Sequence, residues 1–314
     1  MNIFEQQRQR DLKIEKAMKG VKHIIAVGSG KGGVGKSTVA VNLALSLAKK
    51  GYAVGLADSD IYGPSIPTLF NIKNEEVMGR EIDGVSYIIP FEKFGIKLMS
   101  VGFFVDTTKA LMWRGPMASN TLIQLLSETL WGELDFLILD MPPGTGDVPL
   151  TVFQSLPLDG IVVLTSPQEL VSMIVGKAVN MAREMNIPIL GLVENYSYIE
   201  CGNCKEHISV FGKSHIDEIS KKYGIPVLAK LPIDPAIAEA IDGGNVEDLQ
   251  GKWLDGAADA ICKQLVVESE KKSEHVKIAV TTTDEGNVHE HFGHCENFTI
   301  YELEGDNLLN REVI

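Results

Sequence analysis

The chain has 314 residues, of which 45% are hydrophobic and 23% charged, and its formal net charge is −13. This composition is typical of a globular protein and excludes an intrinsically disordered or fibrous chain. The negative charge disfavours nucleic acid and anionic membranes as partners, so a site for an anionic ligand must be built locally.

Residues 1–20 are predicted to form a helical arm. Their few apolar positions favour packing against the rest of the chain over docking on a membrane. No apolar run has the length of a signal-peptide core, and no stretch approaches the roughly 18 apolar residues that a membrane-spanning helix needs. We therefore expect a cytoplasmic protein.

Apolar, strand-like segments alternate with helix-like stretches over residues 21–267. Strands that are apolar throughout and separated by helices indicate a parallel sheet with both faces covered. We therefore predict an α/β domain over 21–267, with a mostly parallel sheet and helices on both faces. Ligands of such sheets bind at the carboxyl ends of the strands. The predicted strands cover residues 23–28, 52–58, 136–140, 160–166, 187–195 and 225–232.

A glycine-rich loop directly follows the first predicted strand and opens a predicted helix. It matches the P-loop pattern G-x-x-x-x-G-K-[ST], in which backbone N–H groups surround phosphate oxygens at a helix N-terminus. In this pattern Lys36 contacts the β- and γ-phosphates, and the Ser37 hydroxyl binds Mg²⁺. The expected ATP site comprises Gly30, Lys31, Gly32, Gly33, Val34, Gly35, Lys36, Ser37 and Thr38.

Carboxylates stand where two of the predicted strands end. Asp58 and Asp60 lie at the end of the second strand, and Asp140 ends the segment 136–140. A carboxylate beside a P-loop can hold the hydration shell of Mg²⁺, and one near the γ-phosphate can orient the attacking water. Asp147, farther along, is either catalytic or the N-cap of a helix.

The loop K-G-G-V-G-K-S-T contains a second lysine, Lys31, and resembles the deviant Walker A motif of the P-loop NTPase class of MinD, ParA and the nitrogenase iron protein. The resemblance implies that Lys31 reaches the nucleotide of a partner chain in a homodimer. It implies Asp140 as the Walker B aspartate, Asp60 as the water-positioning residue and Asp58 near the metal shell. Lys31, Lys36, Asp60 and Asp140 are then the catalytic residues. A solvated loop lysine is the alternative for Lys31.

Three further motifs narrow the resemblance. The chain resembles the Mrp/ApbC iron–sulfur carrier ATPases over about residues 20–266. It has three motifs of that family in the same order: D-S-D-I-Y-G-P-S, D-M-P-P-G-T-G-D and E-N-Y-S-Y-I-E-C-G-N-C. The resemblance implies that Asn195 contacts adenine. It also implies that Pro232 and Asp234 lie near the base and ribose.

The motif Cys201-Gly202-Asn203-Cys204 supplies two soft metal ligands. A cubane cluster needs four thiolates and a structural zinc site needs four Cys or His ligands, so one chain is insufficient. The resemblance implies a 4Fe–4S cluster shared by two chains across a twofold axis. A redox disulfide, a zinc half-site completed by His207 and a structural turn are the alternatives. Cys262 is expected to be a buried core thiol.

Residues 268–275 are predicted to be a charged linker, because they have almost nothing to bury. The segment 276–314 begins a new strand-like pattern and resembles the first third of a NifX-like domain, which binds nitrogenase cofactor precursors. Its His291, His294 and Cys295, close to His289, are candidate metal ligands. A surface histidine cluster is the alternative for these residues.

The leading hypothesis is an ATP-hydrolysing iron–sulfur carrier. It would bind ATP, Mg²⁺ and a labile cluster at a homodimer interface, and exchange the cluster with assembly scaffolds and apo-proteins. We expect neither nucleic acid nor a membrane among its partners. A MinD/ParA-like positioning ATPase and an electron donor like the nitrogenase iron protein are the alternatives.

Overall fold

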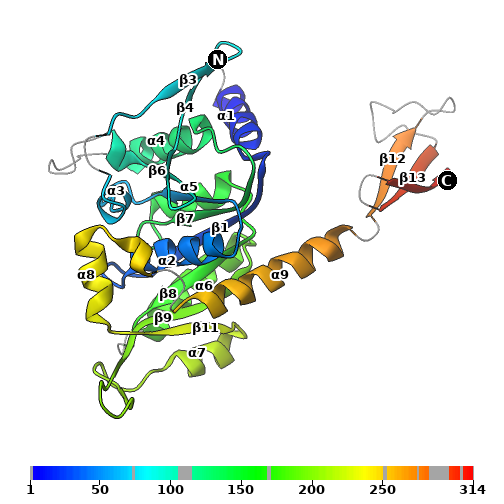
Figure 1. Ribbon diagram of the computed structural model, residues 1–314. Helices are drawn as coiled ribbons and strands as arrows, with labels where there is room; N and C mark the ends of the chain where they lie inside the picture. Colours follow the sequence, from blue (N-terminus) through cyan, green and yellow to red (C-terminus); the bar gives the residue numbers. More distant parts are fainter. Residues whose placement is uncertain are drawn as a thin grey trace. The chain divides into compact units, whose positions relative to one another are not determined.

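A computed structural model of the chain describes residues 3–72, 75–104, 115–167, 171–249, 253–273, 276–282, 297–304 and 307–313. The chain divides into two compact units, Met1–Ala260 and Ile261–Ile314. The first unit contains the phosphate loop and every described strand of the main sheet (Figure 1).

The main sheet of the first unit has nine described strands. They are β1 (Val21–Ser29), β2 (Val54–Asp58), β5 (Phe91–Lys93), β6 (Ile96–Ser100), β7 (Leu134–Asp140), β8 (Gly160–Thr165), β9 (Ile189–Glu200), β10 (His207–Ile208) and β11 (Val227–Pro232). The order is β10-β9-β8-β1-β7-β2-β6-β5, and β11 also pairs with β9. Neighbouring strands are parallel except in the pairs β9–β10 and β5–β6. The six predicted segments correspond to β1, β2, β7, β8, β9 and β11.

Helices lie on both sides of this sheet (Figure 1). The helices of the first unit that follow β1 are α2 (Lys36–Lys49), α3 (Ile66–Leu69), α4 (Gly115–Glu128), α5 (Asp147–Ser155), α6 (Val171–Glu184), α7 (Ile216–Tyr223) and α8 (Pro235–Gly243), with short 3₁₀ turns at Val101–Phe103 and Val246–Leu249. Buried residues of α4, α5 and α6 form one apolar cluster with alternate β1 residues, including Ile24 and Ala26. Helix α2 contacts β1, β2 and β7. The predicted α/β fold is confirmed.

The strand register brings the predicted carboxylates to one edge of the sheet. Asp58 of β2 pairs with Asp140 of β7 on one side and with Ser100 of β6 on the other. Asp140 also pairs with Val27 of β1, three residues before the phosphate loop begins at Gly30. The carboxyl ends of three adjacent strands therefore meet beside the loop, as expected for a ligand site in a parallel sheet.

The N-terminal arm forms helix α1 (Ile3–Met18). Ile14 and Met18 are buried in the same apolar cluster as α4 and α5. Arg10 donates a hydrogen bond to Ser155 Oγ at the end of α5, at 2.7 Å. Arg10 also donates to Asn120 Oδ1 of α4 at 3.5 Å, so the arm is packed on the rest of the first unit through apolar contacts and two hydrogen bonds of Arg10.

Residues 79–88 form a β-hairpin that the sequence patterns do not predict. Strands β3 (Gly79–Ile82) and β4 (Val85–Ile88) pair antiparallel in a separate two-stranded sheet. The sequence of β3, G-R-E-I, lacks the alternation of apolar and polar residues that indicates a half-buried strand. All four residues are exposed in the structure.

Helix α9 (Asp255–Ser273) leads from the first unit into the second. It includes residues 268–273, so this part of the expected linker is helical instead of irregular. The second unit continues with an antiparallel sheet of β12 (Val276–Thr282), β13 (Asn297–Glu304) and β14 (Asn307–Val313), in that order. Among the described residues, every helix is too short or too polar to cross a lipid bilayer.

Candidate functional site

The phosphate loop connects β1 to α2 and requires glycine at two positions. Gly33 and Gly35 have φ values of 76° and 79°, a left-handed conformation that side chains disfavour. A Cβ atom on Gly35 would also lie 2.3 Å from Asn195 Nδ2. The loop thus turns tightly into the N-terminus of α2, where free backbone N–H groups attract phosphate.

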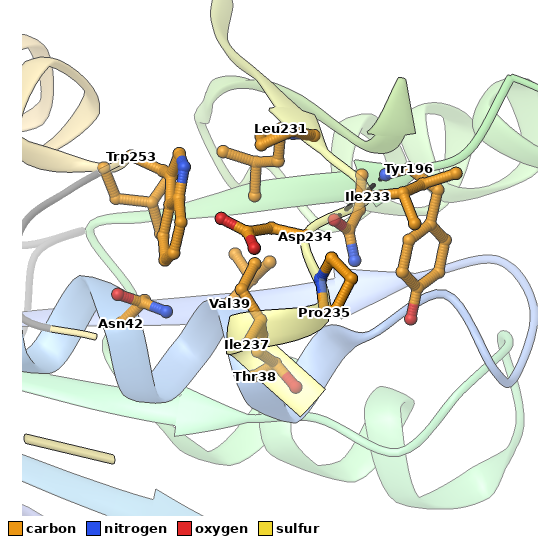
Figure 2. Close-up of a pocket in the computed structure, with 13 residues that line it drawn as sticks. Thr38, Val39, Asn42, Tyr196, Leu231, Ile233, Asp234, Pro235, Ile237 and Trp253 are labelled. Carbon is orange, nitrogen blue, oxygen red and sulfur yellow. Dashed lines mark hydrogen bonds between the residues drawn. The ribbon is translucent and has the colours of Figure 1, made fainter. Parts of the chain in front are cut away.

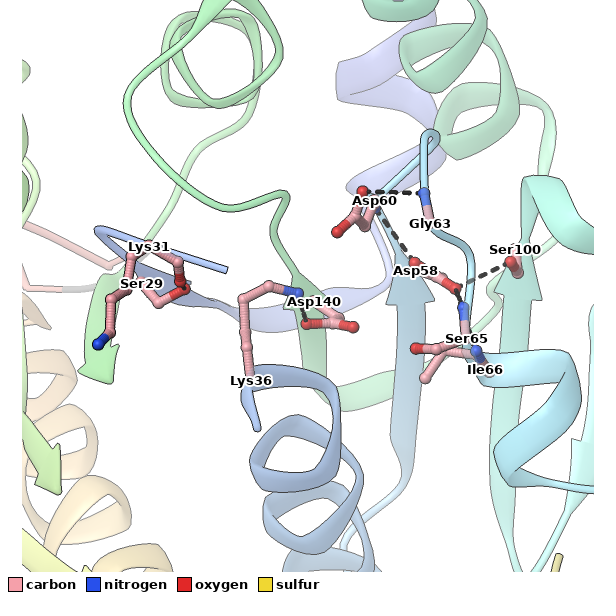
Figure 3. A network of polar contacts seen from close by, with 10 residues as sticks. All are labelled: Ser29, Lys31, Lys36, Asp58, Asp60, Gly63, Ser65, Ile66, Ser100 and Asp140. Atoms are coloured by element: carbon pink, nitrogen blue, oxygen red, sulfur yellow. Dashed lines mark hydrogen bonds and ion pairs between the residues drawn. The ribbon is translucent and has the colours of Figure 1, made fainter. Parts of the chain in front are cut away.

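Lys36, the first residue of α2, forms a buried ion pair with Asp140 at the end of β7 (Figure 3). The Lys36 Nζ atom contacts Asp140 Oδ1, whereas Asp140 Oδ2 is buried and has no hydrogen-bond partner among the described residues. Burial raises the pKa of Asp140, and the positive charge of Lys36 opposes this shift. The pair places one cation and one unsatisfied carboxylate oxygen directly beside the phosphate loop.

Asp58 anchors the loop that follows β2. Its Oδ2 accepts hydrogen bonds from the backbone N–H groups of Ser65 and Ile66, at 2.9 and 3.1 Å, and from Ser100 Oγ at 3.1 Å. Its Oδ1 accepts a hydrogen bond from the Asp60 N–H group at 3.1 Å (Figure 3). Burial, together with the neighbouring charge of Asp140, raises the pKa of Asp58 to about 7.

The raised pKa of Asp58 predicts a stability that falls with pH. The folded ligand-free chain keeps the Asp58 proton up to about pH 7, whereas the unfolded chain releases it near 3.8, the ordinary pKa of an aspartate side chain. Between these values the folded state binds more protons, so the free energy of unfolding decreases as pH rises, by at most about 1.4 kcal/mol per pH unit. Denaturant titrations of the native chain and Asp58→Asn across this window measure the effect, and the slope should be smaller in the variant.

Asp135→Asn is the matched control for this measurement. Its carboxylate receives a hydrogen bond from Lys22, which lowers the pKa of Asp135 in the folded chain. Asp135 is therefore ionised in both states above about pH 5, and its loss leaves the slope unchanged in that window. Equal slopes in the native chain and Asp58→Asn would contradict the prediction.

Asp60 and Lys31 lie on opposite sides of the Lys36–Asp140 pair. Asp60 is half-buried, its Oδ1 accepts from the Gly63 N–H group at 3.2 Å, and its charge contributes to the raised pKa of Asp140. The Lys31 side chain points away from Lys36 and Asp140 (Figure 3), and the Lys31 carbonyl accepts a hydrogen bond from Ser29 Oγ at 2.9 Å. Asp60 thus faces the site of its own chain, whereas Lys31 does not.

A pocket of about 220 Å³ lies beside the first turn of α2 (Figure 2). Asn195 from β9 lies against the phosphate loop there, because its Nδ2 donates to the Val34 carbonyl at 2.9 Å. The structure therefore brings Thr38, Asn195, Pro232 and Asp234 together, although they are far apart in the sequence. The pocket is lined by Thr38, Val39, Asn42, Asn195, Tyr196, Leu231, Pro232, Ile233, Asp234, Pro235, Ile237, Trp253 and Leu254.

Two aromatic side chains of this pocket were missed by the sequence patterns. Tyr196 follows Asn195 directly and has a left-handed φ of 59°, which no propensity indicates for tyrosine. Trp253 precedes α9 and reaches the pocket through the tertiary fold alone. Because Tyr196 directly follows Asn195, its place in the pocket could have been inferred from the sequence. No sequence pattern indicates that Trp253 lines the pocket.

The cysteine pair lies in the turn between β9 and β10. Cys201 is half-buried and Cys204 is exposed. The Cys201 N–H group donates to the Glu206 carbonyl at 2.9 Å, and the Lys205 N–H group donates to the Cys201 carbonyl at 3.0 Å, which closes the turn. Hydrogen bonds from the backbone N–H groups of Cys204 and Asn203 lower the pKa of the Cys201 thiol. The turn therefore favours the thiolate, the form that binds metal.

The surroundings of the cysteines do not complete a metal site within the described part of one chain. No group of three or more His, Cys, Asp and Glu side chains gathers there in a metal-binding arrangement. The His207 ring stacks on Tyr198, with 3.8 Å between the ring centroids. Exposed apolar side chains stand near the turn in sequence: Ile199, Ile208, Val210 and Phe211.

The structure also tests the expectations for Asp147 and Cys262. Asp147 is the first residue of α5 and Gly146 is its N-cap, so the interpretation of Asp147 as an N-cap is wrong. Cys262 is buried, as expected of a core thiol. The candidate ligands His291, His294 and Cys295, with His289, lie outside the described residues.

The chain matches two protein-family models. Residues 20–266 match the ParA-type model described as NUBPL iron-transfer P-loop NTPase, and residues 274–314 match the model described as dinitrogenase iron-molybdenum cofactor. The resemblances inferred from the sequence motifs are therefore confirmed.

Curated relatives support the same family. The chain is 50% identical over 238 residues to an iron–sulfur cluster carrier protein of Aquifex aeolicus. The matched region is 76% of this chain and 65% of the relative. It is 45% identical over 234 residues to an iron–sulfur cluster carrier protein of Escherichia coli, and the matched region is 74% of this chain and 63% of that relative. An iron–sulfur cluster transfer protein NUBPL of Dictyostelium discoideum is 46% identical, covering 73% and 70%. The chain thus spans less than two thirds of the length of the first two relatives.

Solved structures agree with the fold. A nucleotide-binding protein from Archaeoglobus fulgidus, solved in complex with ADP, is 39% identical and has a TM-score of 0.69, covering 77% of this chain and 95% of that one. The cell-division ATPase MinD of Pyrococcus furiosus is 21% identical with a TM-score of 0.54, covering 77% and 99%, and shares the fold. Together with the phosphate loop and the carboxylates beside it, these matches show that the chain belongs to the NUBPL iron-transfer family of ParA-type P-loop NTPases.

Proposed function

We propose that the chain is an ATP-hydrolysing carrier that holds a labile iron–sulfur cluster between two copies of itself and transfers it to apo-proteins. The cysteine turn is the observation that carries this proposal. It presents Cys201 and Cys204 at the end of a hairpin, lowers the pKa of Cys201, and supplies half of the thiolates that a cubane cluster needs. The names of the curated relatives support the same cargo.

The described residues provide the parts of an ATPase. The backbone of the phosphate loop and Lys36 would bind the phosphates, and Asp60 would orient the attacking water. The pocket beside α2 would receive adenine and ribose, with Asn195 at its edge toward the loop. An ADP-bound relative at 39% identity supports this use of the site.

The residues beside the loop also fit Mg²⁺. Asp140 Oδ2 is a buried carboxylate oxygen without a hydrogen-bond partner in the described structure, and hard oxygen ligands are those that Mg²⁺ prefers. Asp140 and the Ser37 hydroxyl would hold the ion or its water shell. When bound, it would neutralise charge on the phosphates.

Two copies are needed on two independent grounds. One described chain supplies only two cysteines at the turn, and the apolar side chains of Ile199, Ile208, Val210 and Phe211 are exposed near them. Lys31 points away from the site of its own chain, which suits a lysine that acts on the nucleotide of a partner. A twofold axis would satisfy both conditions at once. We infer a cytoplasmic homodimer that exchanges clusters with scaffold and acceptor proteins.

Reconstitution tests the proposed cargo. We expect the reduced protein, incubated anaerobically with iron and sulfide, to bind about four iron and four sulfide per dimer and to show a charge-transfer absorption band. Cys204→Ser should lose both the metal and the band, because two thiolates of the shared site are removed. Cys262→Ser is the matched control, since it removes a buried thiol that is not part of the C-x-x-C motif.

Two outcomes would change this assignment. Equal iron content in the native chain and Cys204→Ser would contradict a cluster at the cysteine turn. A cluster that the native protein retains when an apo-acceptor and a chelator are added would support electron transfer instead of carriage.

A further inference from the structure

One strand joins the nucleotide pocket to the cysteine turn. In β9, Asn195 donates a hydrogen bond to the Val34 carbonyl of the phosphate loop, and the strand ends at Glu200, directly before Cys201. Six residues of extended strand cover roughly 20 Å. A displacement of Asn195 is therefore carried toward the cysteines by a short, continuous piece of backbone.

This strand is bent directly after Asn195. Tyr196 has a φ of 59°, which is uncommon for a residue other than glycine. The pairing of β9 with β11 shifts at the same place, between the pairs Lys230–Glu194 and Pro232–Tyr198. Such a conformation persists only where surrounding contacts hold it. The contacts that hold the bend therefore determine how the two ends of β9 are oriented.

The Tyr196 N–H group donates to Asn195 Oδ1 at 3.0 Å, and Glu194 provides two further contacts from a fully buried position. Its Oε2 accepts a hydrogen bond from Ser197 Oγ at 2.5 Å, across the bend. Its Oε1 accepts one from Ser214 Oγ at 2.9 Å, in the segment that returns from the hairpin. Ser214 Oγ in turn accepts from the Ile216 N–H group at 3.4 Å, where α7 begins. One carboxylate thus connects the chain before the cysteine turn to the chain after it.

A buried carboxylate is costly, and here its cost is offset by hydrogen bonds with two hydroxyl groups. We propose that Glu194 is a positioning residue that makes the conformation of the cysteine turn depend on the occupancy of the nucleotide pocket. Nucleotide binding changes the contact between Asn195 and Val34, the bend at Tyr196 adjusts, and Ser197 and Ser214 transmit the change to both sides of the turn. The inference deepens the proposed carrier function and rests on it, because it states how the ATP site acts on the cluster ligands.

Thiol reactivity in the cluster-free protein measures this coupling. We expect the rates of iodoacetamide alkylation of Cys201 and Cys204, followed by mass spectrometry, to differ at least about threefold between the nucleotide-free protein and the protein bound to a non-hydrolysable ATP analogue. In Glu194→Gln the ratio of the rates with and without the analogue should fall to about one. The carboxamide has one acceptor oxygen, so one of the two serine hydroxyls must turn to accept from Nε2, and the charge that strengthens both hydrogen bonds is lost. Affinity for the analogue should stay within about threefold of the native value, since Glu194 does not line the pocket.

A second variant keeps the test decisive. Ser214→Ala retains Glu194 and its bond with Ser197, and removes the contact with the returning segment together with the 3.4 Å contact to the Ile216 N–H group, so it should also bring the ratio to about one. If Glu194→Gln does not fold, Ser214→Ala alone decides. Glu218→Gln is the control, because it removes an exposed carboxylate of α7 that contacts His215 and should leave the native ratio intact.

The outcomes separate the coupling from the proposed cargo. A native ratio of one, or a native-like ratio in folded Glu194→Gln and Ser214→Ala, overturns the coupling whatever the protein carries. Iron and sulfide counts on the same preparations test the carrier function independently. A protein that binds no cluster but shows the expected ratios would retain the coupling and lose the proposed cargo.

Discussion

The Lys36→Met variant is expected to hydrolyse ATP at least about 100-fold more slowly than the native chain. Lys36 is the cation that the first turn of α2 places beside the phosphate loop, and methionine preserves much of its length without the charge. The substitution also leaves Asp140 buried without its counter-ion, which we expect to destabilise the fold by about 3–5 kcal/mol. Phosphate release at saturating Mg-ATP and denaturant unfolding measure the two effects.

The double variant Lys36→Met/Asp140→Asn separates these effects. It removes both charges of the buried pair, so we expect stability to recover by more than half while hydrolysis stays at least about 100-fold slower than in the native chain. Lys49→Met is the matched control, because it removes a half-exposed lysine at the other end of α2 that contacts Asp255 at 3.8 Å. Hydrolysis by Lys36→Met within about threefold of the native rate would contradict the assigned role of Lys36.

Mixing two inactive variants is expected to restore hydrolysis. If Lys31 acts on the partner's nucleotide, a dimer of one Lys31→Ala chain and one Lys36→Met chain has one intact site, composed of Lys36 from the first chain and Lys31 from the second. Random pairing of equal amounts should give about a quarter of the native rate, because half of the dimers are mixed and each has one working site. Each variant alone should be nearly inactive. Phosphate release after co-incubation measures the recovery.

The mixing experiment distinguishes a partner-directed lysine from a solvated one. Full activity of Lys31→Ala alone would support the solvated loop lysine, and an inactive mixture of two folded, dimer-forming variants would contradict an action across the dimer. Mixing Lys31→Ala with Lys49→Met provides the reference, since Lys49 lies at the far end of α2.

The sequence was sufficient to predict six of the nine described strands of the main sheet and the phosphate loop, because these depend on strong local patterns, whereas β5, β6 and β10 were not predicted. Residues 24–27 of β1, 136–139 of β7 and 160–164 of β8 form continuous apolar runs, since helices cover both faces of the sheet. The glycines at 33 and 35 adopt the left-handed conformation that the P-loop pattern implies. Strand order then brought Asp58 and Asp140 together, as their positions at strand ends indicated.

Contacts that depend on tertiary structure could not be predicted. The interaction of Asp58 with Ser100 requires β2 and β6 to be neighbours, and no pattern in the sequence fixes that order. Residues 268–273 look like a linker because they are charged, yet a helix already begun at Asp255 extends through them. The Glu194–Ser214 contact joins residues on either side of a hairpin turn and gives no periodic signal.

The Lys36–Asp140 pair has a consequence for the choice of ligand. Without nucleotide, the most buried cation and anion of the site neutralise each other. A free divalent ion at Asp140 Oδ2 would share the carboxylate with Lys36, which contacts Oδ1, and the two positive charges would repel each other. A metal–nucleotide complex would instead offer phosphate oxygens to Lys36 and a cation to Asp140 at the same time. We therefore expect the ion pair to favour a metal ion that arrives together with its nucleotide over the free metal ion.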